Sequence, residues 1–383
     1  MKVLFVMHNN NRYSGANLAM QEVISLLSSD IEKIVLYPEA NGSAQEYFNN
    51  LGIKTYNIPY WPMLLSETDG KLKNIVKYPL LLVRWIKMKR NCKLLGDIVK
   101  SIDCIYTNSS SVLFGLLLSK AFGIPHIWHI REFCDLDHKL IFPFGKKHYF
   151  SLANKIKSEI IVISKCLYES RKEYFDEKKM HLIYDDVDES YINLKKNMTE
   201  NMTENEICNI LIAGDIKEGK GQLIAVQAMT KLNRGQYHLY IVGKVGNQEY
   251  KNKIDQLIFE QKMEDMITFT GHVSDMNSLR RNMDIGIVAS NSEAFGRVTV
   301  EGMLSGMAMV GRNSGATPEI LDDNCTGLLY DGSSDDLARK IEMLSDIRVR
   351  KKISENGFKK AASTYVKGNC AIEIEQIIKK VIG

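Results

Sequence analysis

Short runs of apolar and β-branched residues alternate with longer segments of helical period along most of the chain. In the first half this pattern predicts strands at 3–7, 33–37, 54–58, 104–106, 127–130 and 160–163, with helices that include 16–28, 112–122 and 146–155. The alternation then restarts with strands at 210–213, 239–242, 267–270, 285–288, 308–310 and 327–329, and with helices at 223–231, 250–263 and 298–304. Alternation of this kind is typical of a parallel sheet covered by helices.

The polar segment 193–206 interrupts the alternation with the short repeat NMTENMTEN and has no hydrophobic period, so it is the best candidate for a linker. We therefore predict an α/β protein with one Rossmann-like domain at 1–192 and a second at 207–364. The remaining residues, 365–383, predict a helix that returns to the first domain. Ligands of such sheets bind at the carboxyl ends of the strands, so a cleft between two facing domains is the expected site.

Composition narrows the class of protein. The 383 residues are 45% hydrophobic and 25% charged, which excludes global disorder and allows two buried cores. The seven cysteines are scattered and form no CxxC pair, which predicts reduced, buried thiols rather than a zinc or redox site. The first ten residues, MKVLFVMHNN, predict a strand, and no apolar stretch approaches the roughly 20 residues of a membrane-spanning helix. We expect a cytoplasmic protein.

The net charge of +4 is too small to indicate a dedicated nucleic-acid-binding protein. It is unevenly divided, because residues 1–196 hold 27 basic and 21 acidic side chains, a net charge of +6, whereas the remainder carries −2. The segment from Lys71 to Lys93, KLKNIVKYPLLLVRWIKMKRNCK, contains eight Lys or Arg and no acid among its apolar residues. This pattern suits a helix lying on the anionic inner face of a membrane, and it equally suits a solvated helix that packs on the core through an apolar stripe.

The most informative motif is SNSEAFGRVTVEGM at 290–303, which follows a buried strand and opens a helix. The main-chain N–H groups around 295–299 are then available to an anion. Glu293 lies in the loop and Glu301 about one turn into the helix, so the two carboxylates can accept hydrogen bonds from opposite ends of one ligand. Carboxylates suit polyhydroxylated ligands, although Glu301 alone is equally well explained as an acid favoured by the helix dipole.

Two other loops also follow predicted strands. Lys220, in GDIKEGKGQ at 214–222, is placed either to put a point charge on a diphosphate or simply to lie in solvent beside a helix. Gly15, in NNNRYSGAN, either permits close approach of a ligand to the backbone or serves only the turn. The loop is not GxGxxG, and no acid follows a second strand at the dinucleotide-binding spacing, which counts against a nicotinamide-dependent enzyme.

His129, in the segment HIWHIRE, lies at the carboxyl end of a first-domain strand and is expected to face the cleft. A structural role is the alternative, and His126 is the rival position on the same strand. An acidic stretch at Asp185, Asp186 and Asp188 lies close to the linker, and we interpret it as a loop or hinge because no metal-binding motif surrounds it.

Glu293 and Glu301, eight positions apart within SEAFGRVTVEGM, resemble the E-x7-E motif of retaining glycosyltransferases of family 4. That family has the GT-B fold, in which two Rossmann-like domains face each other across a cleft. Further similarities follow in order along most of the chain: Gly15, His129 in HIRE, GDIKEGKGQ at 214–222, TGHVSD at 270–275 and GATPEILDDNCTGLLY at 315–330. Their order and spacing together make the resemblance specific.

The resemblance implies roles for individual residues. Glu293 is expected to hold hydroxyls of the donor sugar, and Glu301 the ribose of the nucleotide. The implied catalytic residues are Glu293, His129 and Lys220, with His129 near the scissile bond. The implied donor-binding residues are Gly15, Gly214, Lys220, Val273, Glu293, Ala294, Phe295, Gly296, Arg297, Val298, Thr299 and Glu301. Many family members carry Arg where this chain has Asp215, so we expect Arg297, with Arg131 second, to supply the missing charge.

The implied activity is retaining transfer of a sugar from a nucleotide-diphosphate sugar, with a UDP-sugar as the expected donor. The expected acceptor is a saccharide or a lipid-linked sugar in bacterial surface polysaccharide or glycolipid synthesis. The resemblance implies a front-face route through an oxocarbenium-like transition state, without a settled protein nucleophile and without a cofactor. The lack of a DxD motif in a suitable context predicts metal independence. Two alternatives stay open: a sugar-nucleotide epimerase of GT-B fold, which needs no acceptor, and a non-catalytic membrane-associated scaffold.

Overall fold

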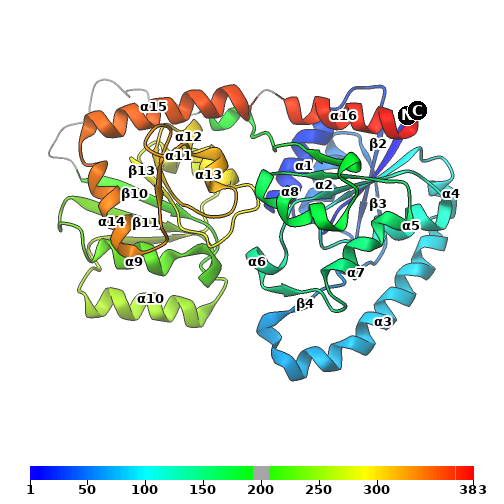
Figure 1. Ribbon diagram of the computed structural model, residues 1–383, viewed down its shortest axis with the longest axis horizontal. Coiled ribbons are helices and arrows are strands. Elements are labelled where there is room, and N and C mark those ends of the chain that lie inside the picture. The colour runs from blue at the N-terminus through cyan, green and yellow to red at the C-terminus, as the bar shows by residue number, and fades with distance from the viewer. Residues whose placement is uncertain (193–206, 367) are drawn as a thin grey trace. The chain divides into compact units, whose positions relative to one another are not determined.

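The computed structural model describes residues 1–192, 207–366 and 368–383, so the predicted linker at 193–206 lies outside the described residues (Figure 1). The chain divides into two compact units. The first comprises Met1–Asp186 together with Gly368–Gly383, and the second comprises Val187–Lys367. The last sixteen residues therefore belong to the first unit in space, although they follow the second unit in sequence.

The sheet of the first unit is parallel throughout, and its strand order is β3-β2-β1-β5-β6-β8-β9. Its strands are β1 (Lys2–Val6), β2 (Glu32–Tyr37), β3 (Lys54–Asn57), β5 (Cys104–Asn108), β6 (His126–Ile130), β8 (Ser158–Val162) and β9 (Met180–Leu182). A short antiparallel pair, β4 (Leu65–Ser66) and β7 (Leu140–Ile141), lies outside this sheet. The helices are α1 (Gly15–Leu26), α2 (Ser43–Asn50), α3 (Gly70–Leu94), α4 (Gly96–Val99), α5 (Phe114–Phe122), α6 (Asp135–His138), α7 (Lys146–Ser151), α8 (Lys165–Arg171) and α16 (Asn369–Ile382).

The sheet of the second unit is also parallel throughout, with the order β12-β11-β10-β13-β14-β15. Its strands are β10 (Cys208–Ala213), β11 (Tyr237–Val242), β12 (Ile267–Gly271), β13 (Ile285–Val288), β14 (Ala308–Arg312) and β15 (Leu328–Tyr330). The helices are α9 (Gln222–Met229), α10 (Gln248–Glu260), α11 (Met276–Arg280), α12 (Arg297–Leu304), α13 (Thr317–Ile320), α14 (Ser334–Met343) and α15 (Ile347–Thr364). This is the strand order of the Rossmann fold, in which the direction of winding reverses between β10 and β13.

Each unit has its own hydrophobic core, in which alternating apolar side chains of the sheet pack against the covering helices. In the second unit the core includes Ile210 and Ile212 of β10 and Ile285 and Ile287 of β13. In the first unit β1 and β5 share their core with Ile374 and other apolar residues of α16. Figure 1 shows α16 (red) beside α1 (dark blue), and the two helices are in contact.

The structure confirms the predicted strands, with ends that shift by no more than two residues, and adds β9 to the first sheet, which the sequence pattern did not predict. It corrects two helices. The helix predicted at 146–155 ends at Ser151 and continues as a 3-10 turn, Ala153–Lys155. The last helix begins at Asn369 rather than at Tyr365, because Gly368 has a left-handed φ of 71° and Tyr365 instead follows the end of α15.

The basic segment from Lys71 to Lys93 forms most of α3, the long light-blue helix of Figure 1. Leu81, Met88 and Cys92 are buried along one narrow stripe of this helix, whereas eight aliphatic side chains of α3 are exposed. These are Leu72, Ile75, Val76, Leu80, Leu82, Val83, Ile86 and Leu94. Across the described ranges, none of the helices is both long and apolar enough to cross a membrane.

Candidate ligand site at the ends of β10 and β13

The loops that follow β10 and β13 meet at the point where the winding of the second sheet reverses. Gly221, at the end of the first loop, has a φ of 72°, and an added Cβ there would lie 2.2 Å from the carbonyl oxygen of Ala289. The N–H of Asn291 donates a hydrogen bond of 3.0 Å to the carbonyl of Gly219. Only glycine at position 221 allows the backbone to approach Ala289 so closely. The two loops therefore form one surface at the edge where open α/β sheets bind ligands.

Lys220 and Glu293 are brought together on this surface. The Lys220 Nζ donates a hydrogen bond of 2.6 Å to Glu293 Oε1. The side chains are 29% and 18% exposed, so both polar groups remain within reach of a ligand. The sequence motifs identified each residue separately, and the structure adds that they form an ion pair.

The loop that follows β14 contacts the backbone of Glu293 and holds it in place. The N–H of Ala316 donates to the carbonyl oxygen of Glu293 at 2.9 Å. Gly315 has a φ of 58°, and an added Cβ at this position would lie 2.6 Å from the same carbonyl oxygen. The position of Glu293 therefore depends on the first glycine of GATPEILDDNCTGLLY at 315–330, one of the segments that resemble the glycosyltransferase family.

The N-terminus of α12 supplies hydrogen-bond donors beside this ion pair. Gly296 precedes the helix with a φ of 102°. The N–H groups of Ala294, Gly296 and Val298 donate to no acceptor among the described residues. The buried hydroxyl of Thr299 also has no hydrogen-bond partner in the described parts of the chain. Such a helix start is suited to an anion, since its dipole and its N–H groups favour negative charge.

Glu301 is buried and is paired with two cations. Its Oε2 accepts a hydrogen bond from Nη2 of Arg280, and its Oε1 lies 3.7 Å from Nε of Arg297. Arg280, at the end of α11, is only 3% exposed and lies with its guanidinium carbon 5.5 Å from the ring centre of Tyr191. Glu301 lies beyond the first turn of α12, and the first turn is where the helix dipole would favour an acid. The structure therefore supports its pairing with the two arginines rather than the helix-dipole explanation.

Arg280 was not identified from the sequence. It lies in SLRRNMD, which matches no motif, and only the tertiary fold brings it to Glu301. Gly214 has a φ of 142° and lies beside the aliphatic stem of Lys220; a Cβ added to Gly214 would lie 3.5 Å from Cδ of Lys220. Asp215 is exposed and its carbonyl accepts from Gln222, while Val273 is half-buried in the loop between β12 and α11.

In the first unit, His129 and His126 differ in what they contact. His126 uses both ring nitrogens within the sheet, with Thr107 Oγ1 and Ser158 Oγ each at 2.8 Å, which assigns it a structural role. His129 Nδ1 lies 2.6 Å from the hydroxyl of Tyr106, and its buried Nε2 has no partner among the described residues. Burial, reinforced by the neighbouring Arg131, holds the pKa of His129 well below its usual range, so the ring is neutral at pH 7.

Arg131 donates hydrogen bonds to Asp185 and Asn108 within the first unit. Its Nη1 donates to both carboxylate oxygens of Asp185, at 2.5 and 2.6 Å, and its Nε donates to Asn108 Oδ1 at 2.5 Å. Asp186 accepts from the N–H of Cys370 at 2.9 Å, at the start of α16. The acidic stretch interpreted from the sequence as a loop or hinge therefore holds Arg131 and α16 in place.

Gly15 begins α1 and is exposed, and a Cβ added there would meet no atom within 4 Å. The fold of the first unit therefore does not itself require glycine at this position. Asn17 organises the preceding loop, because its Nδ2 donates to the carbonyls of Asn9 and Asn11 at 3.2 and 2.8 Å. Gly15 and His129 both lie at the carboxyl end of the first sheet.

Residues 194–360 match the model of the family Glycosyl transferases group 1. The chain is 24% identical over 330 residues to the uncharacterized glycosyltransferase MJ1178 of Methanocaldococcus jannaschii, covering 82% of this chain and 88% of that protein. It is 29% identical over 181 residues to the lipopolysaccharide 1,2-N-acetylglucosaminetransferase of Salmonella typhimurium, covering 44% of this chain and 48% of that protein.

The solved structures that resemble the chain include Anabaena Alr3699/HepE in complex with UDP. This structure has a TM-score of 0.79 and 20% sequence identity, and the match covers 99% of this chain and 100% of that chain. The likeness shows that the chain has the GT-B fold, as the sequence predicted. Together these comparisons show that the chain is similar to group 1 glycosyltransferases, and the match to the family model lies within its second unit.

Proposed function

We propose that this protein is a retaining glycosyltransferase, which moves a sugar from a nucleotide-diphosphate sugar to a hydroxyl of a saccharide or lipid-linked acceptor. The observation that carries the proposal is the arrangement of Glu293 and Glu301 around the N-terminus of α12, each paired with a cation. A carboxylate with several acceptor positions suits vicinal hydroxyls, and the helix start between the two glutamates suits a diphosphate. One ligand with a sugar at each end and phosphates in the middle satisfies all three features.

In this proposal Glu293 orients the donor sugar and Glu301 holds the ribose of the nucleotide. The diphosphate lies against the N–H groups of Gly296 and Val298, and its charge is balanced by Lys220 and Arg297. A uridine nucleotide is the expected donor, which agrees with the complexes of Alr3699/HepE with UDP and UDP-glucose. Asp215 is exposed, so its charge is well solvated beside the site.

The proposed reaction breaks the bond between the anomeric carbon and the phosphate oxygen and forms a bond to the acceptor oxygen on the same face. The acceptor proton passes to the departing phosphate, so no protein base is needed. Lys220, Arg297 and the N-terminus of α12 stabilise the charge that develops on the diphosphate, and Glu293 and His129 position the sugar. We propose that the reaction needs no metal ion; activity that is lost in EDTA and restored by magnesium would contradict this.

A donor screen tests the proposed donor. Thermal unfolding is measured with UDP-, GDP- and ADP-sugars, and the cognate donor is expected to raise the unfolding temperature by mass action. Isothermal calorimetry then compares Arg297→Ala with Lys220→Ala, and we expect Arg297→Ala to weaken donor binding more. Equal affinities of the two variants would contradict the assigned role of Arg297.

The stereochemical outcome is tested by NMR of the product formed with an α-linked donor and a defined acceptor. Retention predicts an α-anomeric product, and a β-anomer would show inversion. Nucleotide release that occurs without any acceptor would instead favour a sugar-nucleotide epimerase. Vesicle binding with neither transfer nor donor hydrolysis would favour a scaffold.

We also propose that the acceptor belongs to bacterial surface polysaccharide or glycolipid synthesis and that the enzyme works at the inner face of the membrane. The similarity to a lipopolysaccharide glycosyltransferase supports the first part. The exposed apolar side chains of α3, among them Leu72 at 82% and Val76 at 76% exposure, support the second. Co-sedimentation with phosphatidylglycerol vesicles is expected to exceed that with phosphatidylcholine vesicles and to fall with added salt.

A further inference from the structure

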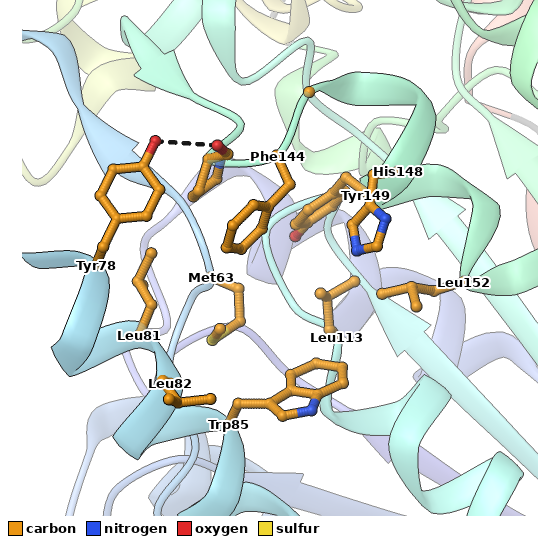
Figure 2. Close-up of a pocket in the computed structure, with 12 residues that line it drawn as sticks. Met63, Tyr78, Leu81, Leu82, Trp85, Leu113, Phe144, His148, Tyr149 and Leu152 are labelled. Atoms are coloured by element: carbon orange, nitrogen blue, oxygen red, sulfur yellow. Dashed lines mark hydrogen bonds between the residues drawn. The ribbon is translucent and has the colours of Figure 1, made fainter. Parts of the chain in front are cut away.

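An apolar cavity of about 350 Å³ lies between α3, the start of α5 and α7, within the first unit. Figure 2 shows Leu81, Leu82 and Trp85 of α3 pointing into this space from one side and Tyr149 and Leu152 from the other. The polar side chains at its edge are few, and two of them are already engaged. The hydroxyl of Tyr78 donates to the carbonyl of Pro143, and that of Tyr149 to the carbonyl of Ser110, each at 3.0 Å.

A second cavity, of about 380 Å³, adjoins the first, and Trp85, Leu113 and Leu152 line both. Four lysines line this second cavity, and no acidic residue does. They come from three separate segments: Lys89 and Lys93 from α3, Lys120 from α5 and Lys155 from the 3-10 turn after α7. The two cavities therefore share part of their lining, including Trp85, and we call them together the depression. The first is apolar, whereas the second combines apolar walls with the four lysines.

The charges of the four lysines are not compensated within the described structure. None of them forms an ion pair with a described residue. Lys89 Nζ lies 5.6 Å from the ring centre of Trp85, so it stands over the junction of the two cavities. Like charges gathered around one hollow repel one another, and an anion placed among them would relieve that repulsion.

We propose that this depression binds one anionic membrane lipid, with a hydrocarbon chain in the apolar cavity and the phosphate of the head group among Lys89, Lys93, Lys120 and Lys155. Each cavity has a volume in the range of small-molecule sites. The walls of the first cavity offer little for a base or a sugar hydroxyl to bond, which disfavours a nucleotide and favours a hydrocarbon chain.

The edge of the depression supports a ligand that comes from a membrane. Leu82 and Phe144 line the first cavity and are 61% and 66% exposed, so they would meet a bilayer that contacts α3. A lipid could then enter with its chain beside these residues, while its head group stays near the lysines. The proposal concerns a site distinct from that of the donor and does not depend on sugar transfer.

A soluble lipid separates binding in the cavity from adsorption to a membrane surface. Dioctanoyl phosphatidylglycerol is titrated below its critical micelle concentration, with calorimetry for affinity and tryptophan fluorescence for location. We expect saturable binding of one lipid per chain and a fluorescence change that is lost in Trp85→Phe. Dioctanoyl phosphatidylcholine and inorganic phosphate are expected to bind at least about tenfold more weakly, since each supplies only part of the recognised chemistry.

Two double variants with equal change of charge provide the matched comparison. Lys120→Gln with Lys155→Gln is expected to weaken binding of the anionic lipid roughly tenfold or more. Lys87→Gln with Arg90→Gln, which alters exposed residues of α3 outside both cavities, is expected to leave the affinity within about twofold. All four positions are exposed, so both proteins should fold.

Several outcomes would overturn the proposal. Vesicle adsorption without binding of the monomeric lipid would show that α3 acts only as a surface. Equal losses in the two double variants would show a diffuse charge effect, and a lipid-independent dimer seen by light scattering, with the cavity inaccessible, would show that a second copy covers it.

Discussion

Glu293 and Glu301 are each paired with a cationic side chain of the protein itself. Glu293 contacts Lys220 at 2.6 Å, and Glu301 contacts the buried Arg280. The two pairs differ in burial, because the Lys220 side chain is 29% exposed and that of Arg280 only 3%. The first pair can open to admit a ligand at small cost, whereas the second fixes its carboxylate in place.

Replacing Glu293 with Gln tests the first pair. The amide keeps the shape of the side chain but loses the charge that pairs with Lys220 and accepts sugar hydroxyls. We expect kcat/KM for transfer to fall roughly 10- to 100-fold, as the loss of a charge-assisted hydrogen bond implies, with little change in unfolding temperature. Glu249→Gln, at an exposed position in α10, is the control; the same loss in both variants would refute the role of Glu293.

The sequence identified Glu293, Glu301 and Lys220 because they lie in recognisable local motifs. It did not reveal their partners. Lys220 and Glu293 are 73 positions apart, and they meet only because β10 and β13 are neighbours in the sheet. Arg280 lies on a five-residue helix without a motif, so its contact with Glu301 could be found only from the fold.

Among the structural elements, the loop after β14 determines where the loop after β13 can lie. Gly315 combines a left-handed φ with close contact to the backbone of Glu293, and both conditions oppose a side chain. Gly235 has a similar left-handed φ of 80°, but an added Cβ there would meet open space. The two positions therefore separate backbone strain from loop-to-loop packing.

We expect Gly235→Ala to cost about 1 kcal/mol of unfolding free energy, which is the strain alone. Gly315→Ala should cost more and should also weaken binding of the nucleotide-sugar donor several-fold, because Glu293, which in our proposal holds the donor sugar, must move. Chemical denaturation and calorimetry measure the two effects. Equal destabilisation of the two variants, with unchanged affinity for the nucleotide sugar, would mean that the loop contact does not position Glu293.

The carboxyl group of Asp186, which accepts a hydrogen bond from the start of α16, has a pH-dependent effect on stability. Burial raises the pKa of Asp186 from 3.8 to about 6. Between pH 4 and 6 the folded chain therefore holds a proton at Asp186 that the unfolded chain has lost, so this group's contribution to stability falls as pH rises. We therefore compare the unfolding temperatures of Asp186→Asn and the original protein at two pH values. The difference, variant minus original, is expected to be more positive at pH 7.5 than at pH 4.5. Parallel pH profiles of the two proteins would contradict the assignment.

The strands were predictable because β-branched runs bounded by polar loops leave few alternatives, and the helices were less so. Helix α15, with IRVRKKISENGFKKAAST, is so polar that it gave no clear apolar stripe, yet Ile353, Gly357 and Ala361 are buried. Tyr365 continued the apolar period of the last helix, and only the backbone shows that Gly368 separates α15 from α16. Small buried residues and left-handed glycines carry little signal in an apolar–polar pattern.

At the scale of the whole molecule, none of the seven cysteines, all of which lie among the described residues, forms a disulfide, and the sequence prediction of buried thiols holds for most of them. Cys92, Cys104, Cys134, Cys208 and Cys370 are buried, Cys166 is intermediate and Cys325 is exposed. Burial raises the pKa of Cys92 and of Cys104 to about 12, so these thiols stay protonated at neutral pH.

A thiol titration checks this distribution. At pH 8 we expect one cysteine of the native protein, Cys325, to react quickly with Ellman's reagent and Cys166 to follow slowly. All seven should react in guanidinium chloride. Cys325→Ser should remove the fast phase; three or more fast thiols in the native protein would contradict the burial found in the structure.

The placement of residues 368–383 in the first unit has a consequence for how the protein is made. As the chain leaves the ribosome, the first 186 residues emerge early but lack α16, whose Ile374 and Ile378 complete their core. The second unit is continuous in sequence and can finish folding during synthesis. Until Glu375 reaches Ser28, where its carboxylate accepts two hydrogen bonds of 2.9 Å, the nascent first unit exposes apolar surface that a chaperone would recognise.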